Sequence, residues 1–334
     1  MAQPVIRTTG LTKIYEYHTK SPGLLNSLKS LFHRETLYAT AVDNISLTVN
    51  EGEFVGFLGP NGAGKTTTLK MLTGIIYPTA GVATVLGYTP SNRQNEFKRQ
   101  FAFVSGQKNQ LWWDLPAMES FILNREIYEL APGKFKQTLD ELVALLGIGD
   151  ILEIPVRKLS LGQRMKCELT AALLHQPRIL FLDEPTIRLD VVSQKNIRDF
   201  LKRYNQERRV TVVLTSHYME DVEKLCKRVV IINHGSLVYD GVLSALLDQY
   251  ANEKMIEMTF ASPVRAEQLR SWGTLKEYQP TRAVLSVPKR KATAAITHLL
   301  QMLPVDDLLI SEMPVDEVIR KIFNGHMAES SGGK

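Results

Sequence analysis

The stretch FVGFLGPNGAGKTTTLKML, residues 54–72, joins a short apolar run, a glycine-rich loop and a segment with helical patterning. The loop, residues 59–66, fits the pattern G-x-x-x-x-G-K-[ST]. Glycines let successive backbone N–H groups point at phosphate oxygens, and the following helix directs its partially positive end at the same anion. We therefore expect a phosphate-binding loop in which Lys65 reaches the β- and γ-phosphates and Thr66 holds Mg²⁺. The alternative is a glycine-rich turn that matches by chance.

A second motif, ILFLDEPT at residues 179–186, places Asp183 and Glu184 directly after a continuous apolar run. Two adjacent carboxylates at the end of a buried strand are costly unless a cation lies nearby. Magnesium bound with ATP supplies that cation, so we expect Asp183 to bind Mg²⁺ and Glu184 to polarise the attacking water as a general base. The alternative is an acidic helix cap that follows a core strand.

The composition is that of an ordinary folded chain. Of 334 residues, 44% are apolar and 22% charged, which excludes disordered and collagen-like classes. The net charge of +5 is too small to indicate a polyanionic partner. Cys167 and Cys226 form neither a disulfide framework nor a zinc cluster, so a reducing, cytoplasmic setting is the default. No window holds about 18 consecutive apolar residues, and the N-terminus lacks an apolar signal core, so we expect neither secretion nor a membrane span.

Residues 1–248 have the pattern of an α/β domain. Short apolar runs alternate with helical patterns, as in a mostly parallel sheet that helices cover. Continuous apolar runs are typical of strands that are buried on both faces. The runs that predict such strands are Phe54–Leu58, Ile179–Leu182, Val210–Thr215 and Val229–Ile232.

Residues 249–327 predict a second, smaller domain of the α+β class. Residues 255–260 and 283–287 alternate like strands, and residues 293–303 have the spacing of an amphipathic helix. We expect the tail, residues 328–334, to be disordered. No repeat of 20–50 residues is present, which argues against a solenoid or a propeller.

A third motif, LSLGQ at residues 159–163, precedes a segment of helix-forming residues, so that Ser160 lies at a helix start. Taken alone, this is an ordinary N-cap. The phosphate loop, LSLGQ, FLDEPT and His217 in TVVLTSH follow one another in the order of ATP-binding-cassette (ABC) ATPases, and the resemblance covers about residues 5–240. It implies a P-loop NTPase fold of the ABC nucleotide-binding type, with a helical subdomain at about residues 105–175.

The resemblance also implies a head-to-tail dimer that encloses two ATP molecules, each between one subunit's phosphate loop and the other subunit's LSLGQ. Loss of the γ-phosphate on hydrolysis would then open the dimer. The implied catalytic residues are Glu184, His217 and Gln107, and the implied Mg²⁺ residues are Thr66, Gln107 and Asp183. The implied ATP-binding residues are Tyr15, Gly59, Pro60, Asn61, Gly62, Ala63, Gly64, Lys65, Thr66, Thr67, Ser160, Gly162 and Gln163.

Three of these assignments compete with plainer interpretations. Tyr15 resembles the aromatic residue that stacks on adenine, and the alternative is a core or edge-strand tyrosine. Gln107 matches the family's glutamine that senses Mg²⁺ and water, and the spacing to the leucines that follow favours it over Gln110. His217 resembles the histidine that contacts the γ-phosphate, whereas a lone histidine there would be a core or capping residue.

Two positions depart from the family pattern, which has glycine at both. Leu161 replaces the middle glycine of LSGGQ, but Gly162 is kept. Arg188 begins Arg188-Leu189-Asp190, the loop that the resemblance places at the dimer interface. A long cation there would clash, or would pair with an acidic or phosphate group. We hypothesise that Arg188 alters coupling between the two ATP sites rather than nucleotide binding.

Two segments predict contacts outside the ATP site. Residues 18–38 form an insertion in which SPGLLNSLKSLFHRETLY has the spacing of a short basic amphipathic helix. Such a helix packs on its own domain, or lies on the membrane or a partner.

Trp112 and Trp113 follow the glutamine loop, where the family faces its membrane partner. Large amphipathic rings serve as interface anchors. The alternative is that one of the two tryptophans is a core residue.

Together these features resemble the ATPase subunit of bacterial ABC exporters, including those for daunorubicin and viologen. The resemblance implies an ATP- and Mg²⁺-dependent ATPase at the cytoplasmic face of the inner membrane, with separate permease subunits and a second ATPase subunit that is a copy or a paralogue.

The alternative is a soluble ABC ATPase that acts as a switch in translation, DNA repair or assembly. A single cassette, no long heptad insertion and scattered basic residues argue against it, so we expect no nucleic acid partner. In a kinase or a small GTPase the LSLGQ motif would have no function, and the guanine-binding motif N-K-x-D of GTPases is not present.

Overall fold

The computed structural model describes residues 3–18, 36–250 and 253–331, and it divides into two compact units, Met1–Gly241 and Val242–Lys334. The sequence pattern predicts a boundary after Asp248. The structure places it seven residues earlier, because helix α9 (Leu243–Tyr250) contacts helix α12 (Val315–Ser331) of the second unit. Within the described residues, no helix is both long and apolar enough to cross a membrane.

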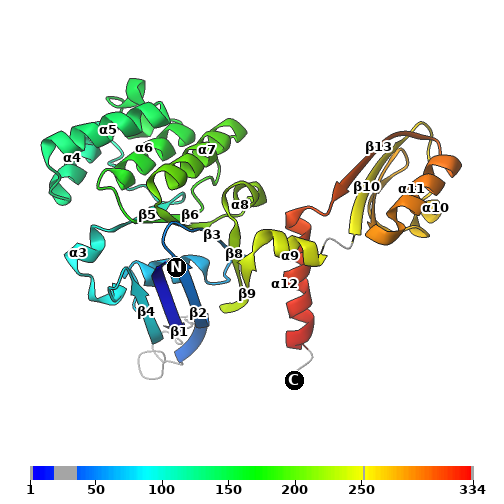
Figure 1. Ribbon diagram of the computed structural model, residues 1–334, viewed down its shortest axis with the longest axis horizontal. Helices are drawn as coiled ribbons and strands as arrows, with labels where there is room; N and C mark the ends of the chain where they lie inside the picture. Colours follow the sequence, from blue (N-terminus) through cyan, green and yellow to red (C-terminus); the bar gives the residue numbers. More distant parts are fainter. Residues whose placement is uncertain (1–2, 19–35, 251–252, 332–334) are drawn as a thin grey trace, which may run out of the picture. The chain divides into compact units, whose positions relative to one another are not determined.

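A six-stranded sheet, in the order β5-β6-β7-β3-β8-β9, forms the centre of the first unit (Figure 1). Its strands are β5 (Phe101–Ser105), β6 (Ile179–Asp183), β7 (Thr211–Thr215), β3 (Phe54–Leu58), β8 (Arg228–Asn233) and β9 (Ser236–Val242). The pairs from β5 to β8 are parallel. Every residue of β3, β6 and β7 is buried, which explains their unbroken apolar runs. The predictions of strands at β3, β6, β7 and β8 are confirmed.

A second, antiparallel sheet packs against the first through a shared core. Its order is β2-β1-β4, from β1 (Pro4–His18), β2 (Thr36–Asn50) and β4 (Ala80–Val85). Ile6 of this sheet, Leu69 of helix α2 (Lys65–Leu72) and Phe181 of β6 belong to one buried cluster. The amphipathic helix predicted within residues 18–38 lies outside the described residues, apart from His18, which ends β1, and 36–38, which begin β2.

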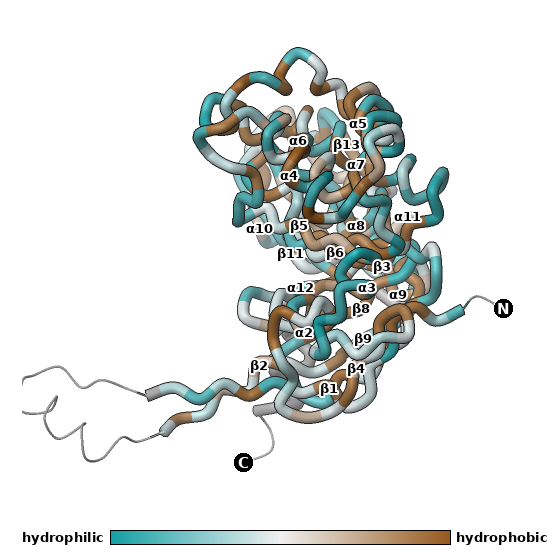
Figure 2. Tube along the Cα trace, turned by 90° about the vertical axis from the view of Figure 1, so that its left-hand side faces the viewer, coloured by the Kyte–Doolittle hydropathy of each residue, from teal (hydrophilic) through white to brown (hydrophobic). Residues whose placement is uncertain are grey.

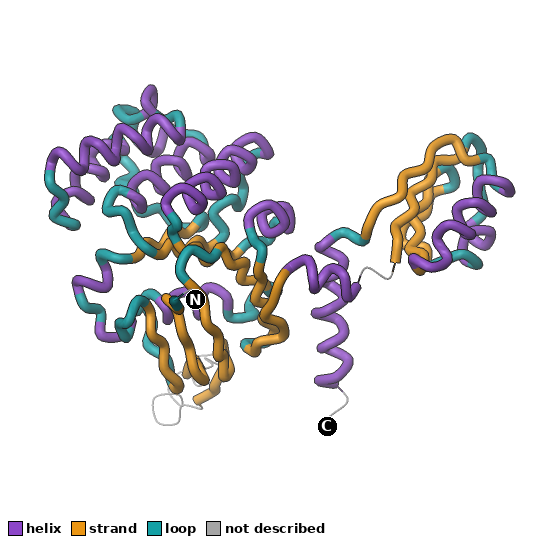
Figure 3. Tube along the Cα trace, viewed as in Figure 1, coloured by secondary structure: helices purple, strands orange, loops and turns teal. Residues whose placement is uncertain are grey.

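Helices joined by loops make up the remainder of the first unit (Figure 3). Their bounds are α3 (Asn95–Lys98), α4 (Ala117–Ile127), α5 (Pro132–Leu146), α6 (Leu161–Leu173), α7 (Val191–Arg208) and α8 (Met219–Leu225). Helices α4 and α5 both contact α6, so α6 is the centre of this helical group. In Figure 2 brown apolar segments recur along the strands.

The second unit is a β-α-β-β-α-β domain. Strands β10 (Glu253–Phe260), β11 (Thr274–Gln279), β12 (Arg282–Pro288) and β13 (Val305–Glu312) form an antiparallel sheet in the order β11-β12-β10-β13, with helices α10 (Ala266–Arg270) and α11 (Lys289–Met302). This is the split, ferredoxin-like arrangement. Ile256, Leu285 and Leu299 lie in its core. The α+β class, both predicted strands and the predicted helix are confirmed.

The predicted disorder of the tail is corrected in part. Helix α12 continues to Ser331, so residues 328–331 are helical, and residues 332–334 lie outside the described residues. The buried side chains of Val315, Val318, Ile319 and Ile322 have the spacing of one helix face. Packing of that face stabilises a helix that then extends into the polar end of the chain.

Candidate active site

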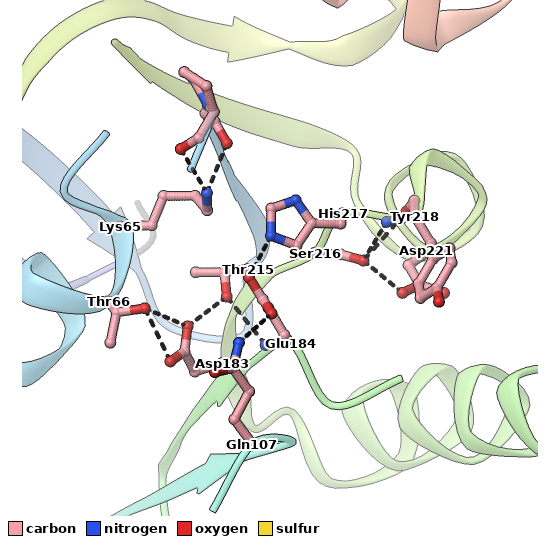
Figure 4. Close-up of polar contacts among 12 residues, drawn as sticks. Lys65, Thr66, Gln107, Asp183, Glu184, Thr215, Ser216, His217, Tyr218 and Asp221 are labelled. Atoms are coloured by element: carbon pink, nitrogen blue, oxygen red, sulfur yellow. Dashed lines mark hydrogen bonds and ion pairs between the residues drawn. The ribbon is translucent and has the colours of Figure 1, made fainter. Parts of the chain in front are cut away.

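One edge of the six-stranded sheet brings together Lys65, Thr66, Gln107, Asp183, Glu184 and His217 from the sequence-predicted set (Figure 4). The strands β5, β6, β7 and β3 are parallel neighbours, so their carboxyl ends lie at the same edge. The phosphate loop follows β3, Asp183 ends β6, and Gln107 and His217 follow β5 and β7. Ligands of open α/β sheets bind at such an edge.

Close contacts exclude a side chain at two glycines of the phosphate loop, and a third, Gly62, has the left-handed φ of +79° that favours glycine. Gly64 has φ +100°, and a Cβ there would lie 2.2 Å from the carbonyl oxygen of Ala41. A Cβ on Gly59 would lie 2.4 Å from the carbonyl oxygen of Ile232. Gly62, in contrast, faces open space. The backbone is therefore tightly held at both ends and open in the middle, as a cradle for an anion must be.

Lys65 is folded back over this loop. Its Nζ donates to the carbonyl oxygens of Gly59 at 2.6 Å and Pro60 at 3.0 Å. Burial lowers the pKa of the Lys65 ammonium, and the carboxylates of Glu184 and Asp183 oppose that shift. The ammonium thus lies beside the cradle at the amino end of α2, where a phosphate would compete with the two carbonyls for it.

Thr66 and Asp183 have the chemistry of a magnesium site. Thr66 Oγ1 lies 3.0 Å from each carboxylate oxygen of Asp183. Thr215 Oγ1 donates to Asp183 Oδ1 at 2.8 Å and so orients the carboxylate. Hydroxyl and carboxylate oxygens are ligands that Mg²⁺ takes, and the residues present therefore fit this ion.

Glu184 is held between two of the predicted catalytic residues. Gln107 Nε2 donates to Glu184 Oε2 at 2.8 Å, and His217 Nε2 lies 2.5 Å from Glu184 Oε1. The backbone of Glu184 has φ +55°, a strained conformation of the kind that clusters at functional sites. Gln110, the alternative to Gln107, donates instead to the carbonyl oxygen of Phe103. The structure thus places Gln107 on Glu184 rather than on the Thr66–Asp183 pair.

The LSLGQ segment caps helix α6. Gln163 N–H donates to Ser160 Oγ at 3.2 Å, and Ser160 N–H donates to Gln163 Oε1 at 2.9 Å, which together form a capping box. A Cβ on Gly162 would lie 2.2 Å from Ser193 Oγ, so glycine is required where α6 meets the start of α7. Across the described ranges, no hydrogen bond or ion pair joins Ser160 or Gln163 to the phosphate loop of the same chain.

The loop Arg188-Leu189-Asp190 precedes α7. Asp190 is the N-cap of this helix: its Oδ1 accepts from Ser193 N–H at 2.9 Å and its Oδ2 from Ser193 Oγ at 2.6 Å. These hydrogen bonds lower the pKa of the Asp190 carboxyl. Arg188 is exposed and has φ +62°, within the left-handed region that favours glycine. This backbone explains why glycine suits the position. An arginine there has to adopt a left-handed conformation that is strained for a residue with a Cβ.

Tyr15 is not a core residue. It lies on β1 opposite Ala39 of β2, and its side chain is 38% exposed. The Lys13 ammonium lies 5.2 Å from the centroid of the ring. The ring therefore remains available to a planar ligand.

The sequence analysis missed a buried network beside the site. Asp221 is fully buried and accepts from Thr186 Oγ1 at 2.5 Å, Ser216 Oγ at 2.7 Å and Arg198 Nη1 at 3.0 Å. It thereby connects the segment before Arg188 with the segment that carries His217. Figure 4 shows its contact with Ser216. The only signal in the sequence is that Thr186 and Ser216 lie inside the motifs, and the contacts with Arg198 and Asp221 required the tertiary structure.

Comparison with known proteins identifies related chains. A family model described as ABC transporter matches residues 42–187, and a model for the EvrA-like ABC transporter C-terminal domain matches residues 252–311. The chain is 34% identical over 225 residues to the ABC transporter ATP-binding protein NatA of Bacillus subtilis, which covers 67% of this chain and 91% of NatA. It is 33% identical over 262 residues to the bacitracin transport ATP-binding protein BcrA of Bacillus licheniformis, covering 78% and 77%.

Solved structures of ABC cassettes share the fold of this chain. The dimeric structure of MJ0796, a bacterial ABC transporter cassette, has a TM-score of 0.59 and 23% sequence identity, and the match covers 71% of this chain and 98% of that one. A dimer of MJ0796 in a post-hydrolysis state bound to ADP and Pi has the same score and coverage. The predicted nucleotide-binding fold is thereby confirmed.

We predict that Asp221→Asn lowers the free energy of unfolding by about 3–5 kcal/mol, because it leaves the buried guanidinium of Arg198 without its main counter-ion. Urea unfolding measures the change. Glu220→Gln is the control, because Glu220 also pairs with Arg198 but is half-exposed, and it should cost under about 1 kcal/mol. Equal losses in the two variants would contradict a buried network centred on Asp221.

We predict that Arg188→Gly changes the ATPase rate or ATP-driven dimerisation, while the free energy of unfolding rises by no more than about 1.6 kcal/mol. Relief of the left-handed backbone raises the free energy of unfolding by about 1–2 kcal/mol. The added conformational freedom of glycine in the unfolded chain lowers it by about 0.4–1 kcal/mol. Thermal unfolding, ATPase assays and light scattering measure the three quantities. If rate and dimerisation both match the wild type, the hypothesis that Arg188 alters coupling is wrong.

Proposed function

The chain belongs to the ATP-binding subunits of ABC transporters, and from that premise we propose that it drives export through a separate membrane permease by Mg-ATP-dependent dimerisation. The observation that carries the proposal is the convergence of Gln107 and His217 on Glu184, next to the Thr66–Asp183 pair. This arrangement supports hydrolysis, since a carboxylate held at both oxygens is positioned to take a proton from water.

Within the ATP site, each residue has a task that its geometry supports. The amides of the phosphate loop and the Lys65 ammonium bind the phosphates, and the exposed ring of Tyr15 stacks on adenine. Thr66 and Asp183 hold Mg²⁺, which when bound neutralises charge on the phosphate oxygens. Glu184 orients and deprotonates the attacking water, while Gln107 and His217 hold its carboxylate. Asn61 and Ala63 of the loop, with Thr67 in the first turn of α2, complete the proposed phosphate-binding segment.

A second ATPase subunit, either a copy or a paralogue, completes the site. Among the described residues, neither Ser160 nor Gln163 has a hydrogen bond or ion pair to the phosphate loop of its own chain, which suits a γ-phosphate presented by another subunit. Val191 and Val192, beside Asp190, are among the most exposed apolar residues of the first unit. Exposed valines next to the Arg188-Leu189-Asp190 loop fit a face that a partner covers.

Trp112 and Trp113 fit a permease contact. They are 51% and 47% exposed, so neither is a core residue. The alternative that one of the two belongs to the core is therefore wrong. Leu115 beside them is also exposed. Three large apolar side chains on one loop form an anchor for a segment of the permease at the cytoplasmic face of the inner membrane.

Export is the direction that the relatives favour. They include the linearmycin resistance ATP-binding protein LnrL of Bacillus subtilis, 34% identical over 220 residues that cover 66% of this chain and 70% of LnrL, and the bacitracin protein described above. We propose a drug or an antibiotic as the class of cargo. The alternative of a soluble switch in translation, repair or assembly is not favoured.

We predict that Glu184→Gln forms a stable dimer in Mg-ATP, because the amide cannot accept the proton from water and the γ-phosphate stays in the interface. The ATPase rate should fall by roughly 10²–10⁴-fold. Multi-angle light scattering with and without Mg-ATP measures the mass, and Glu184→Gln combined with Lys65→Ala is the control that should stay monomeric. A Glu184→Gln chain that stays monomeric in saturating Mg-ATP, beside its permease, would refute the dimer mechanism.

We predict that Trp112→Ala with Trp113→Ala weakens co-purification with the permease while ATP binding stays near the wild-type value. Loss of two anchors of this kind costs an interface about 2 kcal/mol or more. Affinity purification from the native membrane, followed by mass spectrometry, measures the first effect, and nucleotide titration measures the second. The reverse ordering of the two effects would show that the tryptophans belong to the ATP site.

A further inference from the structure

Residues 107–113 form the tryptophan loop, which runs from the catalytic centre to the exposed ring of Trp113. At one end, Gln107 donates to Glu184. At the other end, Trp112 N–H donates to Ser120 Oγ at 3.1 Å, and the carbonyl oxygen of Trp113 accepts from Arg157 N–H at 3.0 Å. The middle of the loop needs a separate support, because its backbone amides lie outside any sheet or helix.

Glu168 supplies that support from helix α6. Its side chain is 3% exposed, and its Oε1 accepts the backbone N–H of Gln110 at 2.9 Å and, over a longer 3.4 Å, that of Leu111. Burial raises the pKa of the Glu168 carboxyl, and the two amides oppose that shift. A buried carboxylate is costly, so its hydrogen bonds to the loop are the contacts that compensate it.

Arg164 contacts the same loop one helical turn earlier. Its guanidinium lies 5.7 Å from the centroid of a Trp113 ring, as a cation–π pair. Residues four apart share one face of a helix, so Arg164 and Glu168 form a single contact strip. The strip meets the tryptophan loop at its backbone and at its exposed ring.

Helix α6 also starts at the capping box of Ser160 and Gln163, within the LSLGQ motif of residues 159–163, which is here the signature segment. We propose that Arg164 and Glu168 are positioning residues that make the tryptophan loop and the signature segment move as one body. A permease that displaces the loop then moves Ser160 relative to the ATP held by the opposite subunit, and engagement of Ser160 with that ATP moves the loop. This inference deepens the proposed function and rests on it.

The coupling is measured by amide hydrogen exchange in the full chain carrying Glu184→Gln, compared with and without Mg-ATP. Light scattering confirms dimerisation of the same samples. With Glu168 present, dimerisation should change exchange at the amides of residues 108–113. In Glu168→Ala the Gln110 and Leu111 amides should exchange roughly tenfold faster, because a charge-assisted hydrogen bond is lost, and their response to Mg-ATP should disappear although the dimer still forms.

Two variants separate coupling from folding. Glu168→Gln keeps an acceptor oxygen and should restore the response, and Arg164→Ala should weaken it while leaving the core intact. Lys166→Ala, on the same helix between them, is the matched control and should behave as the parent. A response to Mg-ATP that persists in Glu168→Ala, or a loop that never responds in the dimeric parent, overturns the inference. Failure of the parent to dimerise instead rejects the proposed function, and the coupling with it.

Discussion

The arrangement of the site depends on one pair of contacts at Glu184. Gln107 holds one oxygen of its carboxylate, and His217 holds the other. Its two partners come from loops that follow β5 and β7, on either side of β6. Only parallel strands in that order bring the three loops to one edge. The buried β3, β6 and β7 keep the edge rigid, because their side chains are packed on both faces.

Two buried carboxylates that take no part in the proposed chemistry connect this centre to its surroundings. Asp221 joins Thr186, Ser216 and Arg198, so that the loop before α7 and the segment of His217 have a common anchor. Glu168 joins α6 to the backbone of the tryptophan loop. Each is costly to bury, and each is compensated by donors from segments distant in sequence, which makes the relative placement of those segments specific.

The second unit is stabilised independently of this site. Its sheet has a core of Ile256, Leu285 and Leu299 on the side of α10 and α11. Ion pairs between Lys321 and Glu253, and between Lys276 and Glu317, join α12 to strands β10 and β11. Helix α12 thus belongs to this unit, and packing of its apolar face explains why helical structure extends beyond residue 327.

The sequence by itself determined the motifs, their order, the α/β class and the buried strands at β3, β6, β7 and β8, because apolar runs and glycine-rich turns are encoded by neighbouring residues. Resemblance to the family, together with the spacing to the leucines that follow, also favoured Gln107 over Gln110. Only the tertiary structure decided that Gln107 meets Glu184 rather than Asp183, that Arg188 has a left-handed backbone, and that Asp221 and Glu168 each tie separate loops together. The contacts of Gln107 with Glu184, of Glu168 with Gln110, and of Asp221 with Thr186 and Arg198 join residues between 23 and 77 positions apart. No local pattern records which side chains the folded chain brings within hydrogen-bond distance.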